Sequence, residues 1–345
     1  MAVGVAPAQN FFSVDGIRLA AVAANIRYKE RPDLVLIKIA AGSVVSGVFT
    51  QNAFCAAPVI VARNHLAQRS SQFFLINTGN ANAGTGETGE TDALRCCNAV
   101  ADLAGNESWQ VLPFSTGVIG EKLPVERIIN SLPNAFQKLT DSNWELAAQG
   151  ILTTDTRPKL SSAQVSIDDQ VVTITGLAKG AGMIKPNMAT MLSYVFTDAC
   201  IDQKSLDGFL REAVNLSFNR LTVDGDTSTN DCCMLTATGL SGVMISDIED
   251  DACQKFKEAL LGVFLELATN LIKDAEGATK FVTVEVNQGK DEQECLQVAY
   301  CIAESPLVKT ALFASDPNWG RILAAVGRAG LENLDIDSVK IYLGE

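Results

Sequence analysis

The sequence predicts a mixed α/β or α+β fold in which large sheets are covered by helices. Short apolar runs, many rich in β-branched or aromatic residues, alternate along the chain with longer runs of helical spacing. Hydrophobic residues make up 47% of the 345 residues, enough for a real core, and charged residues only 19%, which argues against extensive disorder. This length suits two domains or one large domain.

The strand predictions follow the short apolar runs in chain order. They cover residues 34–40, 44–49, 59–62, 73–77, 111–114, 171–175, 191–196, 234–238 and 281–286. No repeat or low-complexity linker interrupts them. The glycine-rich stretch 176–182 is the best candidate for an internal boundary, because it precedes a strand that begins around Thr190.

The helix predictions follow the longer amphipathic runs, at residues 90–103, 124–139, 206–216 and 251–273. The last is the clearest, because apolar side chains from Ala252 to Leu271 recur at three- and four-residue spacing on one face. A short helix is expected at 318–326, with Pro317 at its start.

Composition argues against several classes of protein. The formal net charge of −13 disfavours binding to nucleic acids and to anionic membranes, and would suit a cationic substrate. No apolar run reaches the roughly 18 residues that span a bilayer, and no basic segment precedes an apolar one at the start, so we expect no signal peptide. Nine cysteines without a C-x-x-C pair predict a reduced, cytoplasmic protein.

A single histidine limits the catalytic chemistry. His65 lies in the polar stretch 62–66, which predicts a surface loop, and one histidine excludes a His-rich metal site. A Ser-His-Asp or Cys-His enzyme would have to use His65. We therefore expect any nucleophilic enzyme here to take its base from another group.

Two motifs fit known ligand loops only in part. Residues 84–89 match G-x-G-x-x-G, but six residues separate the preceding strand from Gly84, and neither Asp102 nor Glu107 follows a strand. Residues 224–228 have the acidic spacing of a calcium loop, but the later positions hold Thr229 and Leu235 where Gly and Glu are needed. Residues 84–89 are better interpreted as a flexible loop before a helix, and residues 224–228 as a polar active-site or turn segment.

Two other segments carry candidate chemistry. Residues 115–120 form a glycine-containing turn after a strand, where backbone amides can face an oxyanion, although from these residues alone a structural turn is the default interpretation. In residues 179–192, Ala189 precedes Thr190 at the start of a strand. Cleavage there would give Thr190 a free amine with a pKa of about 7.7–8.0, able to activate its own hydroxyl without a histidine. Composition alone does not establish the cut.

Several segments together resemble the ornithine acetyltransferases, also called bifunctional glutamate N-acetyltransferases, in the family's order and spacing across almost the whole chain. They are NTGNANAGTG (77–86), STGVIGEKLP (115–124), ILTTDTRPK (151–159), KGAGMIKPNMATML (179–192), TVDGDTSTND (222–231), DAEGATKF (274–281) and SDPNWGRILAAVGRAG (315–330).

The resemblance implies how the chain works. It implies self-cleavage at Ala189-Thr190 into chains 1–189 and 190–345, with Thr190 as the nucleophile, and Thr116 and Gly117 stabilising the oxyanion. The other site residues that it implies, all lining the substrate site, are Thr153, with Thr154 as a close competitor, Lys179 and Glu276. From their charges we expect Glu276 to pair with a substrate ammonium and Lys179 with a carboxylate.

The resemblance also implies a fold, substrates and an assembly. The fold is two β-layers between helices, similar to N-terminal-nucleophile hydrolases but wound differently. The acetyl group moves from N-acetylornithine to glutamate, with acetyl-CoA as a further donor in some members and no bound cofactor. The assembly contains two α and two β chains.

Two departures from the family are visible. The chain stops at residues 341–345 inside an expected strand, whereas family members continue and supply an Asn and a terminal Thr or Ser to the substrate. The chain is then either a fragment or a variant whose site is completed otherwise. If it is a fragment, we expect a site that is built but open, in a chain that cuts itself but transfers acetyl poorly. Gly84 stands where Cys is common in the family.

Three other functions stay open at this point. In a related N-terminal-threonine amidohydrolase or aminopeptidase, water would resolve the same acyl-enzyme. A dinucleotide-binding oxidoreductase would use the Gly84 loop. An inactive fragment would only fold or associate.

Overall fold

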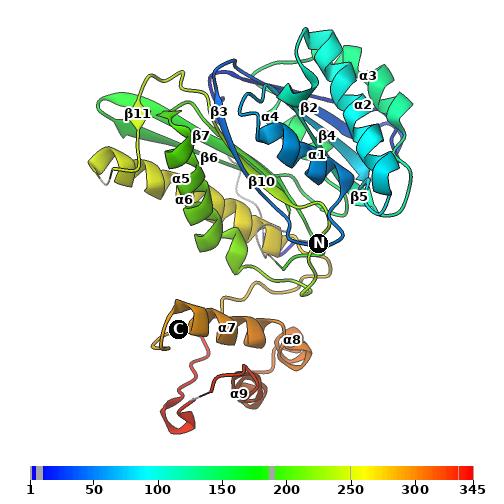
Figure 1. Cartoon of the computed structure of the whole chain (residues 1–345). Coiled ribbons are helices and arrows are strands. Elements are labelled where there is room, and N and C mark those ends of the chain that lie inside the picture. Colours follow the sequence, from blue (N-terminus) through cyan, green and yellow to red (C-terminus); the bar gives the residue numbers. More distant parts are fainter. Residues whose placement is uncertain (1, 5–10, 186–190, 249, 333, 345) are drawn as a thin grey trace.

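The computed structural model describes residues 2–4, 11–185, 191–248, 250–332 and 334–344. Within these residues two β-sheets pack face to face and helices cover their outer faces (Figure 1). The strand order is β1-β2-β4-β5 in the first sheet and β3-β10-β8-β7-β6 in the second. The predicted mixed α/β fold with two β-layers between helices is therefore confirmed.

The first sheet brings the ends of two parallel strands to one edge. β1 (Ile17–Val22), β2 (Leu34–Ile39) and β4 (Phe73–Asn80) are antiparallel neighbours, and β5 (Val111–Val118) runs parallel to β4. The helix α2 (Gly86–Ala104) makes the crossover between β4 and β5, as a parallel pair requires. Both strands therefore end at the same edge of the sheet.

The second sheet has a parallel pair at its centre. β10 (Cys232–Ala237) and β8 (Leu192–Thr197) are parallel, while β3 (Val44–Phe49), β7 (Gln170–Lys179) and β6 (Lys159–Ile167) pair antiparallel with their neighbours. A separate short pair joins β9 (Cys200–Ile201) to β11 (Met244–Ile245).

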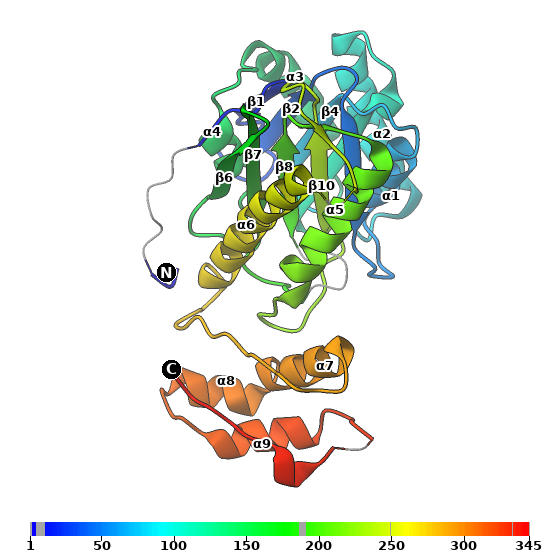
Figure 2. The ribbon, with the colours of Figure 1, turned by 90° about the vertical axis from the view of Figure 1, so that its left-hand side faces the viewer.

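Helices flank both outer faces of the sheets. α1 (Ala57–Leu66), α2 and α3 (Val125–Gln137) pack on the first sheet, and α5 (Gln203–Leu216) and α6 (Asp251–Lys273) lie across the second (Figure 2). α4 (Trp144–Gly150) contacts β1, β6 and β7 at the edge between the layers. Short 3-10 turns complete the body at Ser108–Gln110 and Phe218–Arg220.

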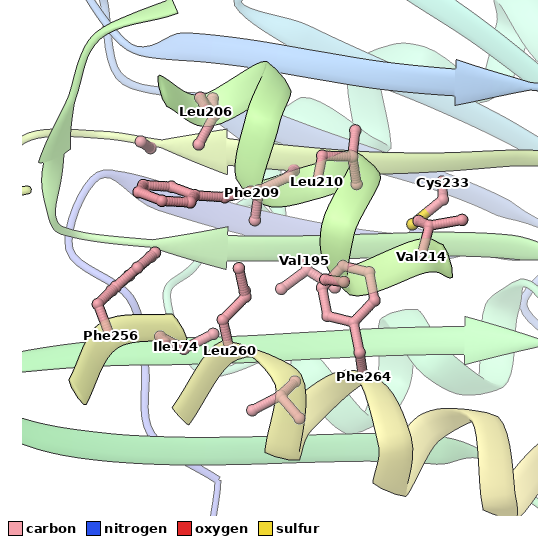
Figure 3. Close-up of a cluster of buried hydrophobic side chains, with 14 of the residues drawn as sticks. Ile174, Val195, Leu206, Phe209, Leu210, Val214, Cys233, Phe256, Leu260 and Phe264 are labelled. Carbon is pink, nitrogen blue, oxygen red and sulfur yellow. The ribbon is translucent and has the colours of Figure 1, made fainter. Parts of the chain in front are cut away.

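The apolar side chains form one layer between the sheets and one on each outer face. Phe74, Phe114 and Tyr194 meet between the sheets, with ring centroids 5.1 to 5.8 Å apart. On the outer face of the second sheet, Phe256 and Phe264 of α6 pack against α5 and the strands (Figure 3). Because each such side chain contributes about 1.5–3 kcal/mol on burial, these layers fix how the strand ends meet.

The last helices form a smaller unit below the sheets (Figures 1 and 2). They have their own apolar cluster and end near a short 3-10 turn. Their bounds are α7 (Glu292–Ala303), α8 (Pro306–Phe313), α9 (Trp319–Gly327) and the turn Ile336–Ser338. None of the helices within the described ranges is long and apolar enough to cross a membrane.

Most of the predicted elements are present, and α6 has the predicted bounds. Two strand predictions are wrong. Residues 59–62 belong to α1, where the β-branched residues face the first sheet. Residues 281–286 form no strand, because Val284 and Val286 pack against the cluster of α7–α9 rather than beside another strand.

Some elements were not predicted from the sequence, namely β1, β6, β9, β11, α1, α4, α7 and α8. His65 also departs from its prediction. It lies on α1 instead of in a surface loop, and it is buried with Nδ1 2.8 Å from the carbonyl oxygen of Val111.

Candidate active site

Predicted site residues from both sheets meet at one edge of the body. Thr116 lies at the end of β5 in the first sheet and Lys179 at the end of β7 in the second, while Thr153 follows α4. The ammonium group of Lys179 donates to Thr153 Oγ1 at 2.8 Å and to Thr116 Oγ1 at 3.2 Å. Three segments that are distant in sequence are therefore in hydrogen-bond contact.

Thr153 and Thr154 were competing predictions for the same role. The hydroxyl of Thr153 contacts Lys179, whereas Thr154 is exposed. The structure therefore brings Thr153 to the site and leaves Thr154 at the surface.

The predicted cleavage residues Ala189 and Thr190 lie outside the described residues. The next residue, Met191, is buried, and its carbonyl oxygen accepts from the backbone N–H of Cys232 at 2.9 Å. From Leu192 onward the chain continues as β8 beside β10.

Gly117 occupies a position that only glycine can fill. Its φ is +135°, and a Cβ atom there would lie 2.3 Å from the carbonyl carbon of Gly79 and 2.5 Å from the backbone nitrogen of Asn80. The register between β4 and β5 shifts at the same point. This close approach of two backbones fixes the path of the chain next to Thr116.

A polar network holds the ends of β4 and β5 in place. Ser115 Oγ donates to Asn77 Oδ1 at 2.5 Å, and the Asn77 amide donates to the carbonyl of Asn80 at 2.8 Å. From the second sheet, the Asn230 amide donates to the carbonyls of Ser115 at 2.9 Å and Ala81 at 2.6 Å. Because all these groups are buried, the network ties Thr116 rigidly to both sheets.

A buried chain of opposite charges lies behind Lys179. Asp155 Oδ2 is 3.8 Å from Lys179 Nζ, and Asp155 Oδ1 is 2.6 Å from Lys159 Nζ. Lys159 Nζ is also 2.6 Å from Asp274 Oδ2. The side chains of Asp155, Lys159 and Asp274 are fully buried, so each charge depends on its neighbours for stabilisation.

The pKa values in this network follow from burial and from the opposite charges. Burial alone would raise the pKa of Asp155, but Lys179 and Lys159 outweigh it and hold the pKa below its ordinary value. Burial lowers the pKa of the Lys179 ammonium, and Asp155 opposes that effect. Asp155 therefore helps to keep Lys179 charged.

A second buried carboxylate, Asp231, lies next to the network. Burial raises the pKa of Asp231 well above its ordinary value, and hydrogen bonds from Ser228 and the charge of Lys179 partly oppose this rise. Its Oδ2 atom has no hydrogen-bond partner among the described residues. Its backbone carbonyl accepts from Thr50 at 2.9 Å, just before β10.

Glu276 completes the set of predicted side chains at this edge. It follows α6 and is exposed, and its backbone N–H donates to the carbonyl of Ala181 at 2.8 Å. Its carboxylate lies so close to Gly182 that a Cβ there would be 2.9 Å from Glu276 Oε1. Glu276 also favours the charged form of Lys179.

The segment 224–228, which resembles a calcium loop, binds the backbone of residues 183 and 184 through Asp224. The Asp224 carboxylate accepts from the N–H groups of Met183 at 2.7 Å and Ile184 at 2.9 Å. Met183 has a φ of +52°, which is unusual for a residue other than glycine. Asp224 thus fixes the segment that leads toward the predicted cleavage residues.

Within the described ranges, no group of three or more His, Cys, Asp or Glu side chains is placed to hold a metal ion. The last glycine of the 84–89 motif is required by local packing. A Cβ at Gly89 would lie 2.0 Å from Thr85 Oγ1 and 2.7 Å from Asn82 Oδ1. The predicted loop is shorter than expected, because α2 begins at Gly86 and four of the six motif residues lie in the helix.

The residues that reasoning from the sequence did not single out are Asp155, Lys159, Asn230, Asp231 and Asp274. All of them lie inside segments 151–159, 222–231 and 274–281, which carry the family resemblance. Polar residues concentrated in those segments were the signal that could have found them.

Comparison with known proteins gives one consistent result. The ArgJ family model matches residues 18–345. The arginine biosynthesis bifunctional protein ArgJ of Pseudomonas fluorescens is 53% identical over 346 residues, and the match covers 100% of this chain and 85% of the relative. The same protein of Pseudomonas syringae pv. tomato is 54% identical over 345 residues, with the same coverage.

Solved structures are also similar over part of the chain. An ornithine acetyltransferase of Mycobacterium tuberculosis, solved in complex with ornithine, is 31% identical, with a TM-score of 0.46. That match covers 51% of this chain and 94% of the other.

Proposed function

This chain belongs to the ArgJ family, and on that premise we propose that it transfers acetyl from N-acetylornithine to glutamate through an acetyl-Thr190 intermediate. Its class is that of the ornithine acetyltransferases and glutamate N-acetyltransferases, the acyltransferases of arginine biosynthesis. The observation that supports the residue assignments is the contact of Lys179 with both Thr116 and Thr153.

The proposed reaction begins with self-cleavage at Ala189-Thr190, giving chains 1–189 and 190–345. The Thr190 hydroxyl then attacks the acetyl carbonyl of N-acetylornithine, and the Thr190 amine takes the hydroxyl proton. The Thr116 hydroxyl and the Gly117 N–H donate to the oxyanion. The C–N bond breaks as the leaving amine takes back the proton, so ornithine departs and the acetyl ester remains.

The second half of the reaction reverses these steps with glutamate. The glutamate amine attacks the acetyl ester, the same two donors hold the oxyanion, and Thr190 regains its hydroxyl proton as N-acetylglutamate forms. Glu276, which is exposed at this edge, is suited to pair with a substrate ammonium, and Thr153 lines the same space beside Lys179.

We also propose a second acetyl donor, an assembly and a cellular location for this enzyme. Acetyl-CoA would be a second acetyl donor, and no bound cofactor takes part. Two copies of each cleaved chain would assemble, and the enzyme would work in the cytoplasm without nucleic acid or membrane partners.

The test combines intact mass with product analysis. The purified protein should give two fragments in place of one chain of 36.7 kDa, and the shorter should begin at Thr190, while Thr190→Ala should stay whole. With N-acetylornithine, N-acetylglutamate should form only when glutamate is added. Free acetate without glutamate would instead identify an amidohydrolase, and an active but uncut chain would contradict the Thr190 mechanism.

A further inference from the structure

Two hydrogen bonds and one longer ion pair hold the Lys179 ammonium in place. An ammonium group has three N–H donors. They face three acceptors, namely Thr153 Oγ1 at 2.8 Å, Thr116 Oγ1 at 3.2 Å and Asp155 Oδ2 at 3.8 Å. Lys179 is only 9% exposed, so these contacts are not averaged by water. Its position is therefore set by the protein before any substrate binds.

This contact determines what the Thr116 hydroxyl can do. A hydroxyl has one hydrogen to donate and two lone pairs to accept with. Because one lone pair faces the Lys179 ammonium, the Thr116 hydrogen points away from Lys179. None of the hydrogen bonds among the described residues uses that hydrogen. An adjacent positive charge also polarises the O–H bond and makes it a stronger donor.

Asp155 holds Lys179 in this position. The Asp155 carboxylate is itself fixed by the N–H groups of Gly180 at 2.7 Å and Thr153 at 3.1 Å, and by Lys159 at 2.6 Å. Asp274 balances the charge of Lys159 at 2.6 Å. Two lysines and two aspartates thus form a neutral, buried set that needs no further anion.

We propose that Lys179, anchored by Asp155, is a positioning residue that orients and polarises the Thr116 hydroxyl as the oxyanion donor. This role rests on the proposed acetyl transfer, and it differs from the expectation that Lys179 mainly binds a substrate carboxylate. The neutral charge set behind Lys179 favours the positioning role, because a bound carboxylate would have to compete with Asp155.

The role predicts a pH dependence. The groups whose charges act on Lys179 are Asp155, Lys159, Asp231 and Glu276. Lys179 must be protonated to polarise Thr116, so kcat should fall as the pH rises through its pKa, which burial lowers. Asp155→Asn removes a charge that opposes this lowering, so the alkaline fall of kcat should move to lower pH.

A double-mutant cycle tests whether Lys179 acts through Thr116. Thr116→Val, Lys179→Gln and the double variant are assayed for kcat and KM, with Lys204→Gln, an exposed ion-paired lysine of α5, as the matched control. Each single variant should lower kcat by about 10²–10³, the usual effect of losing one oxyanion donor. The double variant should be no worse than either single one, because both remove the same interaction. Thr116→Ser should recover most of kcat.

The alternative outcomes separate this inference from the proposed function. Additive losses, with kcat falling by about 10⁴–10⁶ in the double variant, would overturn the positioning role while leaving the acetyl transfer intact. A raised KM with unchanged kcat in Lys179→Gln would assign Lys179 to substrate binding instead. If Lys179→Gln does not fold, as judged by circular dichroism, the same cycle with Asp155→Asn carries the test. A wild-type protein without transfer activity would refute the proposed function itself.

Discussion

The two-sheet body and the C-terminal helices differ in how their ion pairs are placed. In the body, Asp155, Lys159 and Asp274 are fully buried and paired. In the C-terminal unit, the ion-paired carboxylates stay accessible to water, with 69% of the Glu292 side chain and 23% of the Glu304 side chain exposed. The unit is held to the body partly by surface ion pairs and by hydrogen bonds to the backbone.

Buried and exposed ion pairs differ in how firmly they hold the position of a charged side chain. Buried partners hold a charge in one position, because moving it would leave an uncompensated charge in a medium of low dielectric constant. Exposed ion pairs are screened by water and tolerate movement. Thr116, Gly117, Thr153, Lys179 and Glu276 all belong to the body or its immediate continuation, while α7–α9 supply none of them.

The largest expected effect comes from breaking the buried pairs. Asp274→Asn should lower the free energy of unfolding by about 3–5 kcal/mol, because Lys159 loses one of its two carboxylates. The measurement is chemical denaturation in the Thr190→Ala background, which should keep the chain in one piece. A loss below about 1 kcal/mol, the value of an exposed ion pair, would erase the contrast between the two regions.

Packing gives the same contrast with apolar side chains. Ile174→Val, in the layer between the second sheet and α6, should cost about 1.5 kcal/mol, whereas Ile302→Val, in the cluster of α7, should cost about 0.5 kcal/mol, the two ends of the range of about 0.5–1.5 kcal/mol for this substitution. Thermal and denaturant unfolding of both variants would measure the difference. Equal losses would show that the C-terminal cluster is packed as tightly as the body.

A pH series tests the buried network through Asp155. Its folded pKa lies below the unfolded value of about 3.9, so its contribution to stability is present above that pH and is lost as the pH falls. The stability difference between wild type and Asp155→Asn should therefore narrow as the pH falls below about 4. Each unit of pKa shift corresponds to about 1.4 kcal/mol. A constant difference from pH 7 to pH 3 would contradict this assignment.

A smaller effect separates two neighbouring threonines. Thr153→Val removes the hydroxyl that the proposed function places beside the substrate, and should raise KM by about two- to tenfold, since one hydrogen bond contributes about 0.5–1.5 kcal/mol. Thr154→Val, at an exposed position, should leave KM and kcat unchanged. The reverse pattern in steady-state kinetics would give the substrate role to Thr154.

The smallest effect is expected at the surface of the C-terminal unit. Glu292→Gln removes the ion pair with Arg220, and both side chains are more than a third exposed. The free energy of unfolding should fall by no more than about 1 kcal/mol, and less at high salt. A loss comparable to that of Asp274→Asn would show that this contact is as rigid as the buried network.

Local patterns predicted most of the body. The stripe of apolar residues on α6 gave that helix its bounds, and short β-branched runs predicted β2, β3, β4 and β5. The two wrong strand predictions also rested on local sequence patterns. Residues 59–62 have β-branched side chains, but α1 places them against the first sheet. Residues 281–286 have alternating valines but no strand beside them in the described structure.

The sequence by itself determined the mixed α/β class, the segments that carry the family resemblance and the set of candidate residues, because those depend on residue type and spacing along the chain. Only the tertiary structure decided that Lys179 touches Thr116 and Thr153, that Thr153 is inside and Thr154 outside, and that Asp155, Lys159 and Asp274 are buried together. The physical reason is that these contacts join residues up to 115 positions apart. Their distances are set by how two sheets pack, which no local pattern records.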